Sequence, residues 1–97
     1  WTALDPKNDD LTAFLEINRA KDWNGFKQAL RKYAGAMQNF IYADTKGNIG
    51  WYAASKIPIR RKGDGSLPYD GATTDGDWVG TVPFAELPNL YNPPEGF

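Results

Sequence analysis

Residues 38–55, QNFIYADTKGNIGWYAAS, decide the fold of this chain. Two segments in which successive side chains alternate between faces flank the turn sequence DTKGN, a pattern typical of a β-hairpin. Gly47 can take the positive φ angle that a tight hairpin turn requires. Apolar side chains fall on both faces of the predicted strands, so we expect other layers to cover both sides of the hairpin. An isolated two-stranded ribbon is only marginally stable, so we also expect more sheet beside it.

Two short helices are predicted before the hairpin, within residues 8–35. The motif NDD at residues 8–10 offers N-cap side chains and places acids at the positive end of a helix, so the first helix is expected from Asp10 to Ala20. Asp22 can cap the second helix, and Gly35 is expected to end it. Apolar residues at helical spacing mark the buried side of each helix: Leu11, Phe14 and Leu15 in the first, and Trp23, Phe26, Leu30 and Tyr33 in the second.

Residues 56–97 are predicted to be mostly loop with one short strand. Prolines and glycines are frequent between Ser55 and Trp78, which is typical of irregular structure. A loop of about 20 residues is unusual inside a compact domain, so we expect this one to be functional or to pack against something outside the chain. The segment WVGTVPFAELP supplies the short strand. The fold class is therefore α+β, with two N-terminal helices, a β-hairpin and long loops.

The composition excludes several classes of function. The chain has 97 residues, no Cys and no His, and a net charge of −1. One small domain is therefore expected, and neither a disulfide framework nor a Ser–His–Asp triad can form within it. A net charge so close to zero argues against binding to nucleic acid, which requires a basic surface. No apolar run approaches the roughly 20 residues of a membrane-spanning helix, so we expect no membrane span.

Six blocks of sequence occur in an order that identifies a family: WTALDP, NRAKDW, QNFIYADTKGNIGWYA, KIPIRRKGDGSLP, DWVGTVPFAELP and NPPEGF. Together they resemble the interior of the large (β) subunit of the penicillin acylase (penicillin amidase) family. The resemblance implies that residues 1–97 are a single fragment of such a subunit, and part of the αββα architecture of N-terminal nucleophile hydrolases. The extended segments at both ends of the chain also favour a piece of a larger protein.

The resemblance implies a hydrolase that acts on carbon–nitrogen bonds other than peptide bonds. In this family a Ser freed by autoproteolysis attacks the amide, its own α-amino group serves as the base, and an oxyanion hole stabilises the intermediate. No cofactor is required. The family's nucleophile lies upstream of Trp1 and its oxyanion Asn lies beyond Phe97, so the chain alone is expected to be inactive.

The resemblance also implies partners and a location. The protein partners are the remainder of the β subunit and the α subunit of the parent enzyme. The substrate is a small-molecule amide, either a β-lactam side chain or an acyl-homoserine lactone. The family's usual location is periplasmic or secreted.

Three positions match residues with a role in the family. Phe14 falls where an aromatic side chain lines the acyl pocket, although an amphipathic helix also explains it as a core residue. Gln38 falls at a pocket position that is aliphatic or aromatic in phenylacetyl-type enzymes, which argues against a phenylacetyl preference; an ordinary polar residue at a strand edge is the alternative. Gly65 matches a backbone carbonyl of a structural Ca²⁺ site whose other ligands would lie outside this chain. Asp64 beside it is also explained as a solvated turn residue, because the EF-hand pattern is absent.

Other charged and aromatic residues have simple explanations. Asp75 and Asp77 are expected to be solvated loop acids rather than a glycosidase pair. Arg60–Lys62 is expected to be a solvated loop rather than an anion site. A second function remains open, a stand-alone module that binds carbohydrate or peptide through aromatic side chains that look exposed: Trp51, Tyr52, Tyr69 and Trp78.

Overall fold

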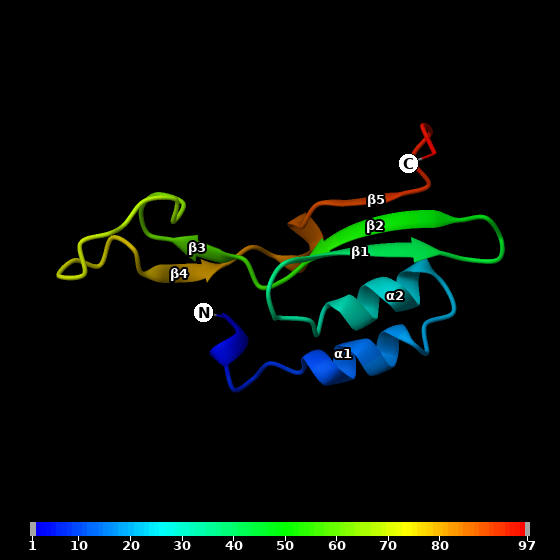
Figure 1. Ribbon diagram of the computed structural model, residues 1–97, viewed down its shortest axis with the longest axis horizontal. Coiled ribbons are helices and arrows are strands. Elements are labelled where there is room, and N and C mark those ends of the chain that lie inside the picture. The colour runs from blue at the N-terminus through cyan, green and yellow to red at the C-terminus, as the bar shows by residue number, and fades with distance from the viewer. Residues whose placement is uncertain (1, 97) are drawn as a thin grey trace.

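The computed structural model describes residues 2–96, so Trp1 and Phe97 lie outside the described residues. In chain order the elements are η1 (Thr2–Leu4), α1 (Asp10–Ile17), α2 (Trp23–Leu30), β1 (Gln38–Ala43), β2 (Ile49–Ala54), β3 (Pro58–Arg60), β4 (Trp78–Thr81), η2 (Phe84–Glu86) and β5 (Asn89–Tyr91). Both α-helices lie on one side of a sheet with strand order β1-β2-β5, and the β3–β4 ribbon projects from one end of this body (Figure 1). The structure is therefore mixed α+β, as the sequence predicts.

Both helices begin where the sequence predicts, because an aspartate caps each of them. The Asp9 carboxylate accepts a hydrogen bond from the backbone N–H of Thr12 at 3.3 Å. The Asp22 carboxylate accepts one from the backbone N–H of Gly25 at 2.8 Å. Each bond satisfies a backbone donor that the first turn of a helix leaves without a partner.

Both helices end earlier than predicted. Helix α1 ends at Ile17 rather than Ala20, and α2 ends at Leu30, so the prediction that Gly35 terminates it is wrong. The backbone N–H of Ala20 bonds to the carbonyl of Ile17 at 3.1 Å, and that of Tyr33 bonds to the carbonyl of Leu30 at 3.0 Å. These three-residue spacings tighten the chain into turns that cannot continue an α-helix. No helix among residues 2–96 is long and apolar enough to cross a membrane.

The predicted hairpin is confirmed as the antiparallel pair β1–β2, and β5 provides additional sheet beside it. In the register of the pair, Phe40 lies opposite Tyr52 and Tyr42 lies opposite Gly50. Strand β5 pairs antiparallel with the other edge of β2, where Tyr91 lies opposite Gly50. Three strands with a covered face make an independently stable unit more readily than a two-stranded ribbon.

The hairpin turn is closed by Asp44 and Gly47. The backbone N–H of Asp44 bonds to the carbonyl of Asn48 at 3.0 Å, and Gly47 takes a φ of 84°. The Asp44 carboxylate accepts hydrogen bonds from the backbone N–H groups of Lys46 at 2.9 Å and Asn48 at 3.0 Å. This is the three-residue hairpin loop in which glycine takes the left-handed position.

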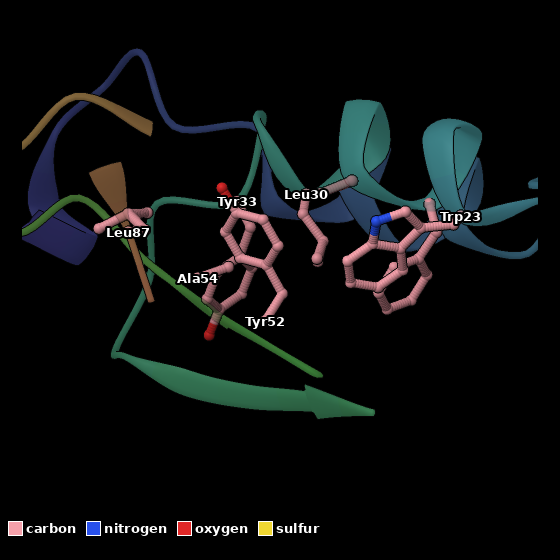
Figure 2. Packing of buried hydrophobic residues seen from close by; sticks show 8 residues of the cluster. Trp23, Leu30, Tyr33, Tyr52, Ala54 and Leu87 are labelled. Atoms are coloured by element: carbon pink, nitrogen blue, oxygen red, sulfur yellow. The ribbon is translucent and has the colours of Figure 1, made fainter. Parts of the chain in front are cut away.

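The core lies between the helices and the helix-facing side of the sheet. Figure 2 shows the main side chains of this cluster: Trp23, Leu30, Tyr33, Tyr52, Ala54 and Leu87. Tyr52 is 1% exposed, stacks on Phe84 at 4.7 Å, and donates a hydrogen bond from its hydroxyl to the Phe84 carbonyl at 2.6 Å. The prediction that Tyr52 is a surface aromatic is therefore wrong, because Tyr52 points from β2 toward the helices.

The opposite face of the sheet is apolar and lies open in the described residues. Ile41 is 73% exposed and Leu90 is 50% exposed, on either side of Trp51. With Ile49 and Pro93 they line a shallow apolar depression of about 290 Å³. Residues 2–96 thus cover one face of the hairpin, whereas the sequence led us to expect cover on both.

The segment predicted to be an irregular loop forms an arm, residues 58–81, built on strands β3 and β4. Beyond the paired strands, the backbone N–H of Arg61 bonds to the carbonyl of Asp77 at 2.9 Å, and that of Lys62 to the carbonyl of Asp75 at 3.0 Å. Tyr69 then holds the tip, because its hydroxyl donates to the Lys62 carbonyl at 2.8 Å. The prediction of one short strand after residue 55 is wrong, since β3, β4 and β5 all occur there.

Candidate functional site

Phe14, the first residue assigned to the acyl pocket, lies at the border of the core. Its side chain projects from α1 and is 48% exposed. The ring packs against Tyr33 at 5.8 Å between centroids and against Phe40 at 6.2 Å. A simple core residue would be buried. Phe14 instead packs one side of its ring on Tyr33 and Phe40 and leaves about half of its surface exposed.

Gln38, the second pocket residue, begins β1 on the same side of the sheet. It is exposed and lies opposite Ala54, which is fully buried in the core. Directly opposed residues of an antiparallel pair share a face, and so do residues two apart on one strand. Gln38 therefore projects from the same face of β1 as Phe40, the residue that supports Phe14.

The turn before Gln38 is held by three side chains from different parts of the chain. The Tyr33 hydroxyl donates to the Ala36 carbonyl at 2.8 Å, the Asp10 carboxylate accepts from the backbone N–H of Gly35 at 3.2 Å, and the Ser55 hydroxyl donates to the Gly35 carbonyl at 2.7 Å. A Cβ on Gly35 would lie 2.9 Å from the Asp10 carboxylate, so glycine permits this approach. The position of Gln38 is thus fixed relative to the start of α1.

A cleft of about 420 Å³ opens beside this turn, between the body and the arm. Its apolar walls include Met37, which is 53% exposed, and Trp78, which is 48% exposed. Phe14 and Gln38 are not among the residues that line this cleft. Sequence reasoning did not assign Tyr33 or Phe40, the two rings that contact Phe14, to the site. The aromatic spacing of Tyr33 and Phe40 was visible in the sequence, but their convergence on Phe14 depends on how α1 packs against β1.

Gly65, the residue matched to a calcium site, lies in the tip of the arm with a φ of 89°. The Asp64 carboxylate accepts hydrogen bonds from the backbone N–H of Ser66 at 2.9 Å and from its hydroxyl at 2.6 Å. Arg60 donates to the Asp64 carbonyl at 3.2 Å, and its guanidinium carbon would lie 2.7 Å from a Cβ on Gly65. The hydrogen bonds from Ser66, assisted by the charge of Arg60, hold the pKa of Asp64 below its usual value.

The comparison with known proteins identifies the family. A family model described as Penicillin amidase matches residues 1–97. The chain belongs to the penicillin amidase family. It is 39% identical over 88 residues to penicillin G acylase from Escherichia coli, covering 90% of this chain and 10% of that protein. It is 33% identical over 87 residues to acyl-homoserine lactone acylase QuiP from Pseudomonas fluorescens, covering 90% of this chain and 11% of that protein.

A solved structure of a penicillin amidase relative confirms the fold. The chain superposes on a thermostable penicillin G acylase from Alcaligenes faecalis with a TM-score of 0.82 and 32% identity. The match covers 98% of this chain and 17% of the relative's chain. By comparison, the chain spans about a tenth of the length of the penicillin G acylase and acyl-homoserine lactone acylase relatives described above. It corresponds to a small part of a much larger penicillin amidase-type protein.

The calcium site that the penicillin amidase resemblance implies would take only a backbone carbonyl at Gly65 from this chain, so it stays a prediction, and the side chains around Gly65 do not favour it. Calcium is bound by several oxygen ligands, with carboxylates prominent among them. Among residues 2–96 there is no group of three or more acidic, His or Cys side chains that could hold a metal ion. The Asp64 carboxylate is engaged by Ser66, and the Arg60 guanidinium beside Gly65 places a positive charge where a second cation would be repelled.

Three of the remaining charged and aromatic candidates make structural interactions in this penicillin amidase segment. Asp75 pairs with Lys62 at 3.1 Å on the surface of the arm. Trp51 donates its indole N–H to the Asn39 side chain at 2.9 Å, and the Tyr69 hydroxyl accepts from the backbone N–H of Gly65 at 3.0 Å. The family match covers the whole chain, which leaves no separate segment for the alternative binding module.

Proposed function

We propose that the protein containing this chain hydrolyses the amide bond between an acyl group and an amine. The family assignment supports this, as do relatives named penicillin G acylase and acyl-homoserine lactone acylase. In the proposed mechanism the nucleophile is an N-terminal Ser outside residues 1–97, activated by its own α-amino group. Such chemistry needs no His or Cys, and the chain has neither.

The role of this chain in the proposed reaction is to form one wall of the acyl pocket, through the side chains of Phe14 and Gln38. The observation that carries the assignment is the half-exposed ring of Phe14, supported by Phe40 on the face of β1 from which Gln38 also projects. An apolar ring and an amide that project from the same side of the sheet can contact the hydrocarbon and a polar group of one acyl chain. A buried amide without a partner is unfavourable, so the pocket should accept an acyl chain that bears a polar group better than an unsubstituted phenylacetyl group.

The rest of the parent enzyme, a further part of the β subunit and an α subunit, supplies the other pocket walls and covers the open apolar face of the sheet. The exposed side chains of Ile41 and Leu90 support this arrangement, because an apolar surface of this kind marks an interface. A periplasmic or secreted location accords with the family resemblance.

The pocket assignment is tested with Phe14→Ala and Gln38→Leu in the intact enzyme. The measurement is kcat/KM for nitroanilides of phenylacetic acid, hexanoic acid and a hydroxyhexanoic acid. Phe14→Ala should lower the preference for phenylacetyl over hexanoyl, and Gln38→Leu should lower the preference for hydroxyhexanoyl over hexanoyl. Each ratio should change by on the order of ten-fold, the effect of a small misfit in a specificity pocket.

Two neighbouring residues provide matched controls. Leu15 is 49% exposed on the same helix, and Asn39 follows Gln38 but faces the other side of β1. Leu15→Ala and Asn39→Leu should leave the ratios unchanged. If Phe14→Ala and Gln38→Leu behave like these controls, neither residue belongs to the pocket. Turnover by the purified 97-residue chain would refute the separate claim that the nucleophile lies outside it.

A further inference from the structure

The rings of Phe14, Tyr33 and Phe40 pack together at the border of the candidate pocket, and Tyr33 is the buried member of the three. Its ring contacts Phe14 at 5.8 Å with an interplanar angle of 79° and Phe40 at 5.1 Å with an angle of 77°. Both are edge-to-face contacts, the arrangement that aromatic pairs favour. Tyr33 is 9% exposed, whereas Phe14 is 48% exposed. Tyr33 therefore supports the outward-facing ring without itself forming part of the surface.

The hydroxyl of the same side chain reaches the second candidate pocket residue through the backbone. It donates to the carbonyl of Ala36 at 2.8 Å, two residues before Gln38. Burial, assisted by the negative charge of Asp10, raises the pKa of Tyr33 above its usual value, so the hydroxyl stays protonated and continues to donate. One residue thus contacts the ring of Phe14 and holds the turn that leads into Gln38.

We infer that Tyr33 is a positioning residue that sets Phe14 and Gln38 relative to each other and thereby tunes the acyl preference of the enzyme. The inference rests on the proposed function, since it presumes that Phe14 and Gln38 contact the acyl group. Tyr33 acts through these two residues and does not touch the substrate. Misplacing a pocket wall by about 1 Å is enough to change the ratio of rates for two acyl groups.

The test compares phenylacetyl and hexanoyl nitroanilides as substrates of the intact enzyme. Tyr33→Leu removes the ring contacts and the hydroxyl, and it should shift the kcat/KM ratio in the same direction as Phe14→Ala, by on the order of ten-fold. Tyr33→Phe keeps both ring contacts and loses only the bond to Ala36, so it should shift the ratio less. Phe26→Leu is the matched control, because Phe26 is 6% exposed and packs on Trp23 and Tyr42 instead. It should leave the ratio unchanged.

A double substitution shows whether Tyr33 acts through Phe14. If it does, Tyr33→Leu combined with Phe14→Ala should shift the phenylacetyl-to-hexanoyl ratio by clearly less than the product of the two single shifts, because the ring that Tyr33 positions is then absent and only its hold on Gln38 is lost in addition. Shifts that multiply in the double variant would overturn the inference. Should Tyr33→Leu fail to fold, Phe40→Leu removes the other support of Phe14 and is expected to shift the ratio in the same direction.

The outcomes separate the inference from the proposed function. An unchanged ratio in Phe14→Ala refutes the pocket assignment and the inference with it. A shifted ratio in Phe14→Ala, together with variants of Tyr33 and Phe40 that behave like Phe26→Leu, refutes only the inference and leaves the pocket in place.

Discussion

Replacing Gly50 with Ala tests the packing of the core where Trp23 of α2 meets the sheet. A Cβ on Gly50 would lie 2.6 Å from Cζ3 of Trp23 and 3.0 Å from Cε3 and Cη2 of the same ring. Trp23 is 8% exposed and stacks on Tyr91 at 5.1 Å and on Phe26 at 5.7 Å, so it cannot simply turn away. Because carbon atoms pack best at about 3.5–4.0 Å, the ring or the strand must move by roughly 1 Å.

Two opposing effects determine the sign of this change. Overpacking of a core costs about 1–3 kcal/mol. Replacing Gly by Ala at a site without strain stabilises by about 0.4–1 kcal/mol, because the unfolded chain becomes less flexible. The clash is the larger effect, so the local free energy of unfolding should fall by about 1–2 kcal/mol, which corresponds to a roughly 5- to 30-fold larger open population.

Hydrogen exchange of the β2 amides in the intact protein measures this population directly. Gly50→Ala should accelerate exchange by the same roughly 5- to 30-fold factor. Gly80→Ala is the control, because a Cβ on Gly80 in β4 meets nothing within 4 Å and should not accelerate exchange in β2. If β2 exchanges in Gly50→Ala as it does in the unsubstituted protein, the assigned contact between Trp23 and the sheet is incorrect.

Two further predictions concern the loops. The hydrogen bonds of Asn48, the side-chain bond above all, lower the pKa of Asp44 to about 2 from its ordinary value of 3.8. A lowered pKa means that the carboxylate stabilises the hairpin turn fully above pH 3.8 and loses this effect as the pH falls through about 2. An NMR titration of Asp44 should show a midpoint near 2, and a midpoint near 3.8 would contradict the hydrogen-bond assignment. In the arm, the Gly65 amide donates to the Tyr69 hydroxyl, so Tyr69→Phe should accelerate hydrogen exchange at Gly65. A calcium chelator should leave this exchange unchanged. Acceleration by the chelator alone would show that a metal ion holds the turn.

Local rules explain which parts of the fold were predictable from the sequence. Asp22 caps α2 through a residue three positions along the chain, and Gly47 permits the hairpin turn through its own φ angle. Such signals act within a few residues and are therefore visible in the sequence. Strands β3 and β5 have only three residues each, and their partners lie far away in the chain. Their pairing depends on tertiary packing, which cannot be predicted from the sequence of the few residues in each strand.

The candidate site was predictable only in part, for the same reason. Phe14 and Leu15 belong to one apolar stripe, and they have nearly equal exposure, 48% and 49%. What distinguishes Phe14 is its contact with Tyr33 and Phe40, which come from later parts of the chain. Likewise, Trp51 and Tyr52 are adjacent aromatics in one strand, and only the position of the helices shows that Tyr52 is the buried one.

The apolar residues on the open face of the sheet complete this argument. Ile41 is 73% exposed, although a strand that faced water would normally carry polar residues there. Residues 2–96 give this side chain no cover, while the chain spans only about a tenth of its curated relatives. The alternation that identified the hairpin thus describes two interfaces. The helices of this chain cover one of them, and the exposed apolar side chains of the other support the proposal that further parts of a larger protein cover it.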